Sequence, residues 1–445
     1  MFKPVSKRKA TAVTSTVVLL GSLIVLNGSG GAAATPSHPQ PQPDRGRQWA
    51  NTWMTPTTHA NLTGRTNAGF NNQSARMIVH TTVSGAQVRI RLSNEDGEQA
   101  MTVGHATVAK ADLSTSEVSD IDPATLHQLR FGGQVSAVMN KGADLLSDPV
   151  DLAVGREADL VITVFYPTPT GPITLHATTR QASFYGPGDL TGDVTGAGFD
   201  LARPCCWINL AGVDVLRHSN YGPVVVFGDS LAEANGSTFN ANQRWPNLLY
   251  TRLAAAKGES APAVLNASLS GARLNHEGTE PKADVSPGFP ELGTNALARM
   301  DDDIFDQTHV GTVITDIGIC DIWMSDDTAE EVIASLRQVN QQIKEHGMRS
   351  LVATFAPYKS DEIAAAHWTP AHELRRQAVN EYLRNSDEFD GLIDFDKVLR
   401  NPADPERLLP AYDSGDHFHP NDLGNQAMAD AIDLSMLLRA PAPVS

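Results

Sequence analysis

The apolar pattern of the chain changes near residue 220, and this change restricts the folds open to it. Before that point, apolar residues alternate with polar ones, as in 77–83 and 88–92, which is typical of half-buried strands. After it, the runs 224–227 and 310–317 are apolar throughout, as in strands buried on both faces. Residues 329–346 between later runs repeat apolar side chains at helical spacing. The sequence therefore predicts a β domain followed by an α/β domain.

Residues 48–215 are expected to form an all-β sandwich. Further strands are predicted at 160–165 and 173–176, separated by a segment rich in proline and glycine. No part of this region keeps a sustained helical spacing. Three of its aromatic residues have two interpretations, a sugar-binding face or the core of the sandwich, and the core is the commoner role; they are Trp53, Phe70 and Tyr185.

Residues 220–437 are expected to form a parallel sheet with helices on both faces. Apolar strands alternate with helical segments, and parallel strands need such crossovers. The predicted strands are 224–227, 264–265, 310–317, 351–355 and 392–395. In open sheets of this kind, active sites lie beyond the carboxyl ends of the strands. We therefore expect functional residues just after these runs.

The first 34 residues are predicted to be a signal peptide. A basic start precedes a short apolar stretch at 13–26, and Ala32, Ala33 and Ala34 supply small residues for cleavage. The apolar stretch is too short and interrupted for a membrane span. We therefore expect a secreted protein without a stable membrane anchor, cleaved near Ala34. Residues 35–47 are expected to be a flexible leader, and 438–445 a loose tail.

The formal net charge of -17 limits the partners. An acidic protein is repelled by nucleic acid and by anionic lipid headgroups. Three cysteines leave at least one without a disulfide partner, so no disulfide framework holds the chain together. A disulfide from Cys320 to Cys205 or Cys206 stays open, and so does the oligomeric state.

Two short segments carry the residues for nucleophilic catalysis. Ser230 follows an apolar strand and Gly228, so its hydroxyl can lie exposed at the end of the sheet. Asp416 and His419 share a short loop, where a carboxylate can orient the imidazole that activates a serine. His417 adjoins Asp416, and the two side chains would diverge. A metal site at these histidines is the alternative, but other ligands in a recognisable spacing are lacking.

These segments resemble the SGNH hydrolases, also called GDSL esterases and lipases, of the exported actinobacterial two-domain type. The matching blocks begin with Phe227-Gly228-Asp229-Ser230-Leu231, continue with 265–271, and end with the D-x-x-H motif at 416–419. The resemblance implies a flavodoxin-like three-layer α/β sandwich. It also implies that Ser230, Asp416 and His419 form a catalytic triad. The backbone N–H groups of Ser230 and Gly271 would then hold the oxyanion.

The third family block, usually G-x-N-D, departs from the pattern. It is Gly318-Ile319-Cys320-Asp321, with Cys320 in place of the asparagine that donates to the oxyanion. A thiol is a weak donor, and loss of one donor typically lowers turnover by about 100- to 1000-fold. Water or another side chain such as Asn275 could replace it, the enzyme could be slower, or hydrolysis could be lost. We expect catalysis to be retained because the other groups are present.

The sequence thus predicts a secreted serine esterase that hydrolyses acyl or acetyl esters of lipids, carbohydrates or small molecules. No metal or organic cofactor is expected. One alternative is an O-acyltransferase that uses the same triad. The other is a carbohydrate-binding protein with weak catalysis.

Overall fold

The computed structural model describes residues 46–61, 64–202, 206–281, 288–360 and 367–439. The predicted signal peptide, nearly all of the leader and most of the tail lie outside these ranges. No helix in the described ranges is long and apolar enough to cross a membrane.

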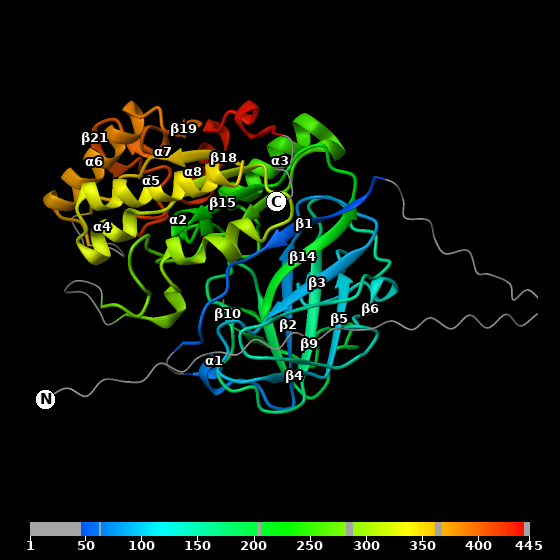
Figure 1. Cartoon of the computed structure of the whole chain (residues 1–445). Helices are drawn as coiled ribbons and strands as arrows, with labels where there is room; N and C mark the ends of the chain where they lie inside the picture. Colours follow the sequence, from blue (N-terminus) through cyan, green and yellow to red (C-terminus); the bar gives the residue numbers. More distant parts are fainter. Residues whose placement is uncertain (1–45, 62–63, 203–205, 282–287, 361–366, 440–445) are drawn as a thin grey trace, which may run out of the picture. The chain divides into compact units, whose positions relative to one another are not determined.

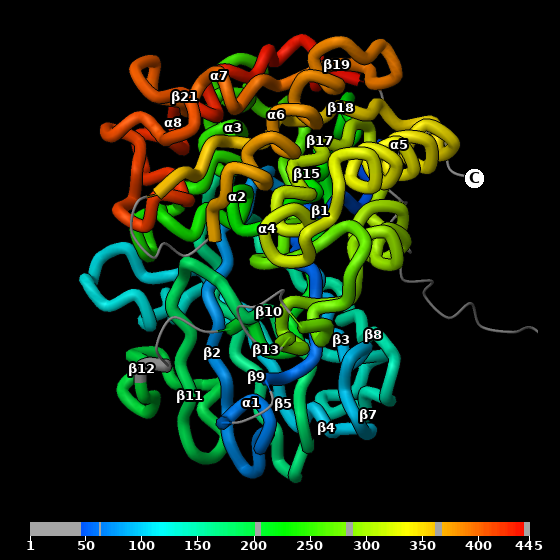
Figure 2. Tube along the Cα trace, turned by 90° about the vertical axis from the view of Figure 1, so that its left-hand side faces the viewer, coloured from blue at the N-terminus to red at the C-terminus, as the bar shows by residue number. Residues whose placement is uncertain are grey.

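The N-terminal region consists of antiparallel strands, as predicted. One sheet has four strands in the order β1 (Gln48–Met54), β14 (Leu210–Arg217), β3 (Val88–Ser93) and β8 (Asp144–Leu146). The other has six, in the order β12 (Asp200–Ala202), β11 (Ser183–Pro187), β2 (Gln73–His80), β9 (Asp159–Tyr166), β5 (His105–Lys110) and β6 (His127–Gln128). Figure 2 shows β11, β2, β9 and β5 side by side. The N-terminal region also contains two two-stranded sheets, β4 (Met101–Val103) with β7 (Ala137–Met139), and β10 (Leu175–His176) with β13 (Trp207–Ile208).

Side chains on alternate positions fill the core of this region. In β3, Val88, Ile90 and Leu92 are buried, as the alternation predicts. Trp53 is also buried, and its ring meets that of Trp207 edge to face at 4.8 Å. Phe70 and Tyr185 are likewise buried and in contact. All three aromatic residues singled out from the sequence therefore belong to the core.

The C-terminal half contains the predicted parallel sheet. Its five strands lie in the order β16 (Val264–Asn266), β15 (Val224–Gly228), β17 (Thr312–Asp316), β18 (Arg349–Ala353) and β19 (Gly391–Ile393). Every neighbouring pair is parallel. This is the flavodoxin-like strand order, 2-1-3-4-5 in the order of the chain. The direction of winding reverses at β15, and in open sheets of this kind ligands bind beyond the carboxyl end of the strand where this happens.

Two groups of helices cover the sheet (Figure 1). One group consists of α3 (Trp245–Lys257), α7 (Phe395–Leu399) and α8 (Asp422–Ala431), in which α8 contacts both of the others. The other comprises α4 (Ile319–Ser325), α5 (Ala329–Glu345) and α6 (Pro370–Asn385). α5 begins with a capping box between Thr328 and Glu331, which satisfies backbone N–H groups at its start. The predicted helix at 329–346 and the α/β fold class are confirmed.

The two regions meet along the chain and in space. β14 ends at Arg217 and β15 begins at Val224, so residues 218–223 join the two regions. β1 contacts β16, and the Thr308 N–H donates to Asn51 Oδ1 at 2.8 Å. The antiparallel region therefore packs directly on the α/β region that carries the candidate site.

Candidate active site

Ser230 lies at the sharp turn between β15 and the one-turn helix α2 (Ser230–Glu233). Gly228 ends the strand, where a Cβ atom would approach Ala232 Cβ to 2.6 Å and Ser268 Oγ to 2.7 Å. Asp229 caps α2, and its carboxyl group accepts from the Leu231 N–H at 2.9 Å. The turn therefore needs a glycine and a short capping side chain directly before Ser230.

Asp229 is buried beneath the turn near a second buried carboxyl group. Burial and the charge of Asp316 raise the pKa of Asp229 well above its ordinary value. Burial raises the pKa of Asp316 to about 7. The cap at Asp229 is thus favoured in its neutral form, which avoids burying a charge.

His419 brings a base to Ser230 from the loop before α8. Its Nε2 lies 2.8 Å from Ser230 Oγ, and its Nδ1 lies 2.5 Å from Asp416 Oδ2. Ser230 and His419 are 5% and 7% exposed, so little water competes for their hydrogen bond. Phe418 packs edge to face on the His419 ring at 4.7 Å. The imidazole is therefore held between hydroxyl and carboxylate.

Asp416 is fixed by the backbone of its own loop. Its Oδ1 accepts from the N–H groups of Phe418 and His419 at 2.9 and 2.8 Å. Burial acts to raise the pKa of Asp416, but hydrogen bonds from His419 and these N–H groups outweigh it. The pKa therefore lies well below its ordinary value. The carboxylate stays ionised at neutral pH and can stabilise a protonated imidazole.

His417 is paired separately and points to a different aspartate. Its Nδ1 lies 2.6 Å from Asp413 Oδ2, and its side chain is 37% exposed. Each histidine of the loop thus has its own carboxylate, Asp413 for His417 and Asp416 for His419. The expected divergence of His417 and Asp416 agrees with this arrangement, and the two pairs account for the histidines without a metal.

The turn that contains Gly271 follows β16 and lies next to the Ser230 turn. Gly271 has a φ of 76°, and a Cβ atom there would approach Leu292 Cδ2 to 2.7 Å. A residue with a side chain would be strained at this position. Within the ranges that the structure describes, the N–H groups of Ser230 and Gly271 donate to no other protein group. Both are available to a ligand.

Cys320 lies in the first turn of α4, beyond the end of β17. β17 ends at Asp316, and Gly318 with a φ of 129° starts the helix. Cys320 is a buried thiol, whereas Cys206 is disulfide-bonded. The possible disulfide from Cys320 to Cys205 or Cys206 is therefore not formed.

Asp321, the last residue of the third block, ties α4 to the segment after Gly271. Its two carboxylate oxygens accept from the N–H groups of Leu274 and Asn275 at 2.8 and 3.0 Å. Burial raises the pKa of Asp321 to about 7, against the effect of these two donors. The Asn275 amide donates to Asp327 at 2.9 Å. Its side chain is thus engaged there, so it is a poor substitute for the missing oxyanion donor.

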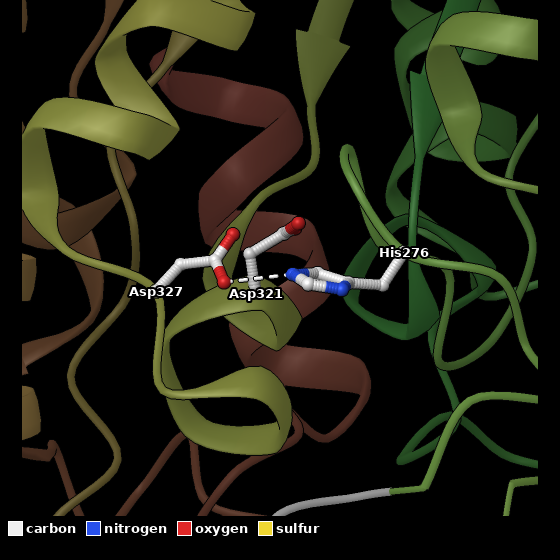
Figure 3. A group of neighbouring side chains, drawn as sticks. All are labelled: His276, Asp321 and Asp327. Atoms are coloured by element: carbon white, nitrogen blue, oxygen red, sulfur yellow. Dashed lines mark hydrogen bonds and ion pairs between the residues drawn. The ribbon is translucent and has the colours of Figure 1, made fainter.

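His276, Asp321 and Asp327 form a cluster whose ligand atoms lie within 4.8 Å of one another (Figure 3). It is the one such group with metal-ligating side chains in the described ranges. His276 Nε2 lies 2.7 Å from Asp327, and its Nδ1 lies 2.8 Å from Glu280. Each group of the cluster already has a hydrogen-bond partner from the protein. The cluster therefore braces the segment 274–276 against α4 and gives no independent sign of a metal.

Two further residues adjoin the site, although the sequence analysis did not single them out. Glu233 ends the helical turn that Ser230 begins, and it hydrogen-bonds Ser270, the neighbour of Gly271. His176 of the β region contacts Glu233. A carboxylate three residues after the serine was the available local signal for Glu233; nothing in the local sequence indicated His176.

An open α/β sheet with a serine, a histidine and an aspartate in hydrogen-bond contact at its carboxyl edge is the arrangement of serine hydrolases. Residues 224–432 match the family model described as GDSL-like lipase/acylhydrolase. The α/β domain belongs to this family, which confirms the resemblance seen in the sequence. Family membership supports ester hydrolysis as its general chemistry.

Several solved structures are similar to a part of the chain. An acetyl xylan esterase is 20% identical, with 47% of this chain and 96% of that chain covered and a TM-score of 0.34. The aryl esterase of M. smegmatis is 16% identical, with 49% and 100% covered and a TM-score of 0.37. An esterase from Pseudoalteromonas sp. is 15% identical, with 47% and 93% covered and a TM-score of 0.32. A comparison with curated proteins gives no match.

Proposed function

We propose that the α/β domain is a serine esterase that cleaves carboxylic esters through an acyl-enzyme. The observation that carries the proposal is that Ser230, His419 and Asp416 form a continuous series of hydrogen bonds. Ser230 and His419 are 189 residues apart in the sequence. Ser230 attacks the ester carbonyl, His419 takes its proton and later returns it to the leaving alcohol, and Asp416 orients His419. Water then hydrolyses the acyl-serine.

The N–H groups of Ser230 and Gly271 are proposed to stabilise the oxyanion that forms during attack. They follow β15 and β16, two adjacent parallel strands. Neither is engaged by the described part of the protein. Donors held in place before the reaction stabilise developing charge without reorganisation. The proposed mechanism needs no metal or organic cofactor.

The wider proposal is a secreted enzyme that acts on acyl or acetyl esters of lipids, carbohydrates or small molecules. Its support is the basic and apolar start of the sequence and its acidic charge.

Labelling with a fluorophosphonate tests the serine esterase proposal. The probe phosphonylates a serine only when a base and an oxyanion site activate it. We expect the native protein to be labelled on the peptide that contains Ser230, whereas heat-denatured protein is not. Equal labelling of native and denatured protein, or a modified residue other than Ser230, would contradict the proposal.

Replacing Cys320 with asparagine is expected to raise kcat by on the order of 100-fold. The reason is that an amide is a strong donor at a position where the thiol is a weak one. The rate of hydrolysis of an activated acetyl ester measures the effect. Cys320→Ala is the control and should change the rate little. An unchanged rate in Cys320→Asn would show that Cys320 does not limit oxyanion stabilisation.

A further inference from the structure

His176 is a fully buried histidine whose two ring nitrogens both face acceptors. It lies in β10 and is 0% exposed. Nδ1 lies 2.9 Å from the Pro56 carbonyl oxygen, and Nε2 lies 3.0 Å from that of Thr178 and 2.6 Å from Glu233 Oε1. A ring that donates at both nitrogens is an imidazolium. Burial acts to lower the pKa of His176, but Glu233 outweighs it and the pKa is raised.

Glu233 uses its other carboxylate oxygen to hold the turn before Gly271. Oε2 accepts from Ser270 Oγ at 2.7 Å and from the Ser270 N–H at 3.2 Å. Glu233 is 2% exposed and ends the same helical turn that Ser230 begins. One buried carboxylate therefore links the two turns whose N–H groups point to the oxyanion in the proposed mechanism.

A buried arginine of the α/β domain adds positive charge near Glu233. Arg244 is buried near Glu233, and burial lowers its pKa to about 10. Its Nη2 lies 3.5 Å from Gln181 Oε1, and its Cζ lies 5.6 Å from the centre of the Trp207 ring. His176, Gln181 and Trp207 all come from the β region. The β region thus contacts Glu233 directly through His176 and contacts the neighbouring Arg244 through Gln181 and Trp207.

We propose that His176 of the β region positions the oxyanion donors of the α/β domain through Glu233. The inference rests on the proposed roles of Ser230 and Gly271. The His176 ring orients Glu233 through its Nε2 contact, and Glu233 then fixes Ser270 and with it the Gly271 N–H. Donors stabilise a transition state only when they are held in place. In this role the β region completes the active site, and His176 and Glu233 are positioning residues.

Glu233→Gln is the first test. Glutamine keeps the shape, but it has only one acceptor oxygen, whereas His176 and Ser270 both donate to Glu233. Because an amide NH₂ group cannot accept, either the donation from His176 or the one from the Ser270 N–H must be lost, and displacement of a donor by about 1 Å costs up to about 100-fold in rate. We expect kcat for an activated acetyl ester to fall about 10- to 100-fold with KM changed less than about threefold, and phosphonylation of Ser230 to slow similarly.

Two substitutions of His176 separate its charge and donors from its bulk. The centre of the His176 ring lies 5.4 Å from that of the Trp207 ring. His176→Phe keeps a ring at this position but removes both donors, so we expect a loss of kcat similar to that of Glu233→Gln. His176→Gln keeps an N–H group for Glu233 and should retain more of the rate. In the double variant His176→Phe/Glu233→Gln, the loss should equal that of the single variants, because residues in one series of contacts are not additive.

Asp214→Asn is the matched control for loss of a buried carboxylate. Asp214 pairs with Arg89 inside the β region and is 2% exposed. It should lower the melting temperature without changing kcat. The inference is overturned if Glu233→Gln hydrolyses and is phosphonylated at the wild-type rate, or if the losses of the double variant multiply. If His176→Phe does not fold, Glu233→Gln and His176→Gln decide the question by the same rates.

This outcome is distinct from failure of the proposed function. If the α/β domain is not a serine esterase, the wild-type protein itself neither hydrolyses the ester nor labels at Ser230. If only the positioning inference fails, the wild type labels and Glu233→Gln labels equally fast.

Discussion

Replacing Ser230 with alanine is expected to lower kcat for an activated ester by on the order of 10⁶-fold. The hydroxyl oxygen is the atom that forms the acyl-enzyme in the proposed mechanism. His419 acts as a base in that mechanism and cannot take the place of the missing nucleophile. The fold should be unaffected, because the side-chain hydrogen bond of Ser230 in the described part of the chain goes to His419 and alanine favours the helix α2. Initial rates and the melting temperature measure the two effects.

Ser268→Ala provides a control for the removal of a neighbouring buried hydroxyl. Ser268 is 1% exposed, and its Oγ lies next to the space beside Gly228. We expect this variant to keep a rate within about threefold of the wild type. The assignment of Ser230 as nucleophile fails if Ser230→Ala hydrolyses the ester at a rate close to that of the wild type.

The two-domain fold was predictable because the strands of the two domains have different patterns of apolar residues in the sequence. β3 alternates because one face of its sheet is buried, whereas β15 and β17 are buried along their whole length. The order of the strands was beyond a local pattern, since it depends on the side to which each crossover turns. The placement of β15 between β16 and β17 depends on the packing of the crossover helices against the sheet.

The candidate site was predictable where its residues lie within one loop, as Asp416 and His419 do. The strand before Cys320 was predicted to run to residue 317 because the apolar run continues past Asp316, but β17 ends at Asp316 and Gly318 at positive φ starts a helix. The contact between His176 and Glu233 joins residues 57 positions apart in different domains. No local pattern reports such a contact, because each side chain by itself resembles an ordinary polar residue on a strand or a short helix.

Replacing Asp416 with asparagine is expected to lower kcat by on the order of 10⁴-fold. Oδ1 of Asp416 accepts from two backbone N–H groups, so the oxygen of an asparagine stays there. Its NH₂ group then faces His419 Nδ1 and donates to it. The remaining ring proton must move to Nε2, toward Ser230 Oγ, and the imidazole can no longer accept the serine proton.

Asp413→Asn is the matched control, because Asp413 has the same geometry toward the other histidine of the loop. It accepts from the N–H groups of Gly415 and His417 and pairs with His417 Nδ1. Both variants should lower the melting temperature, but only Asp416→Asn should lower kcat by orders of magnitude. Steady-state hydrolysis of an activated ester compares them. Equal losses of rate would mean that the shape of the loop, and not the tautomer of His419, controls the reaction.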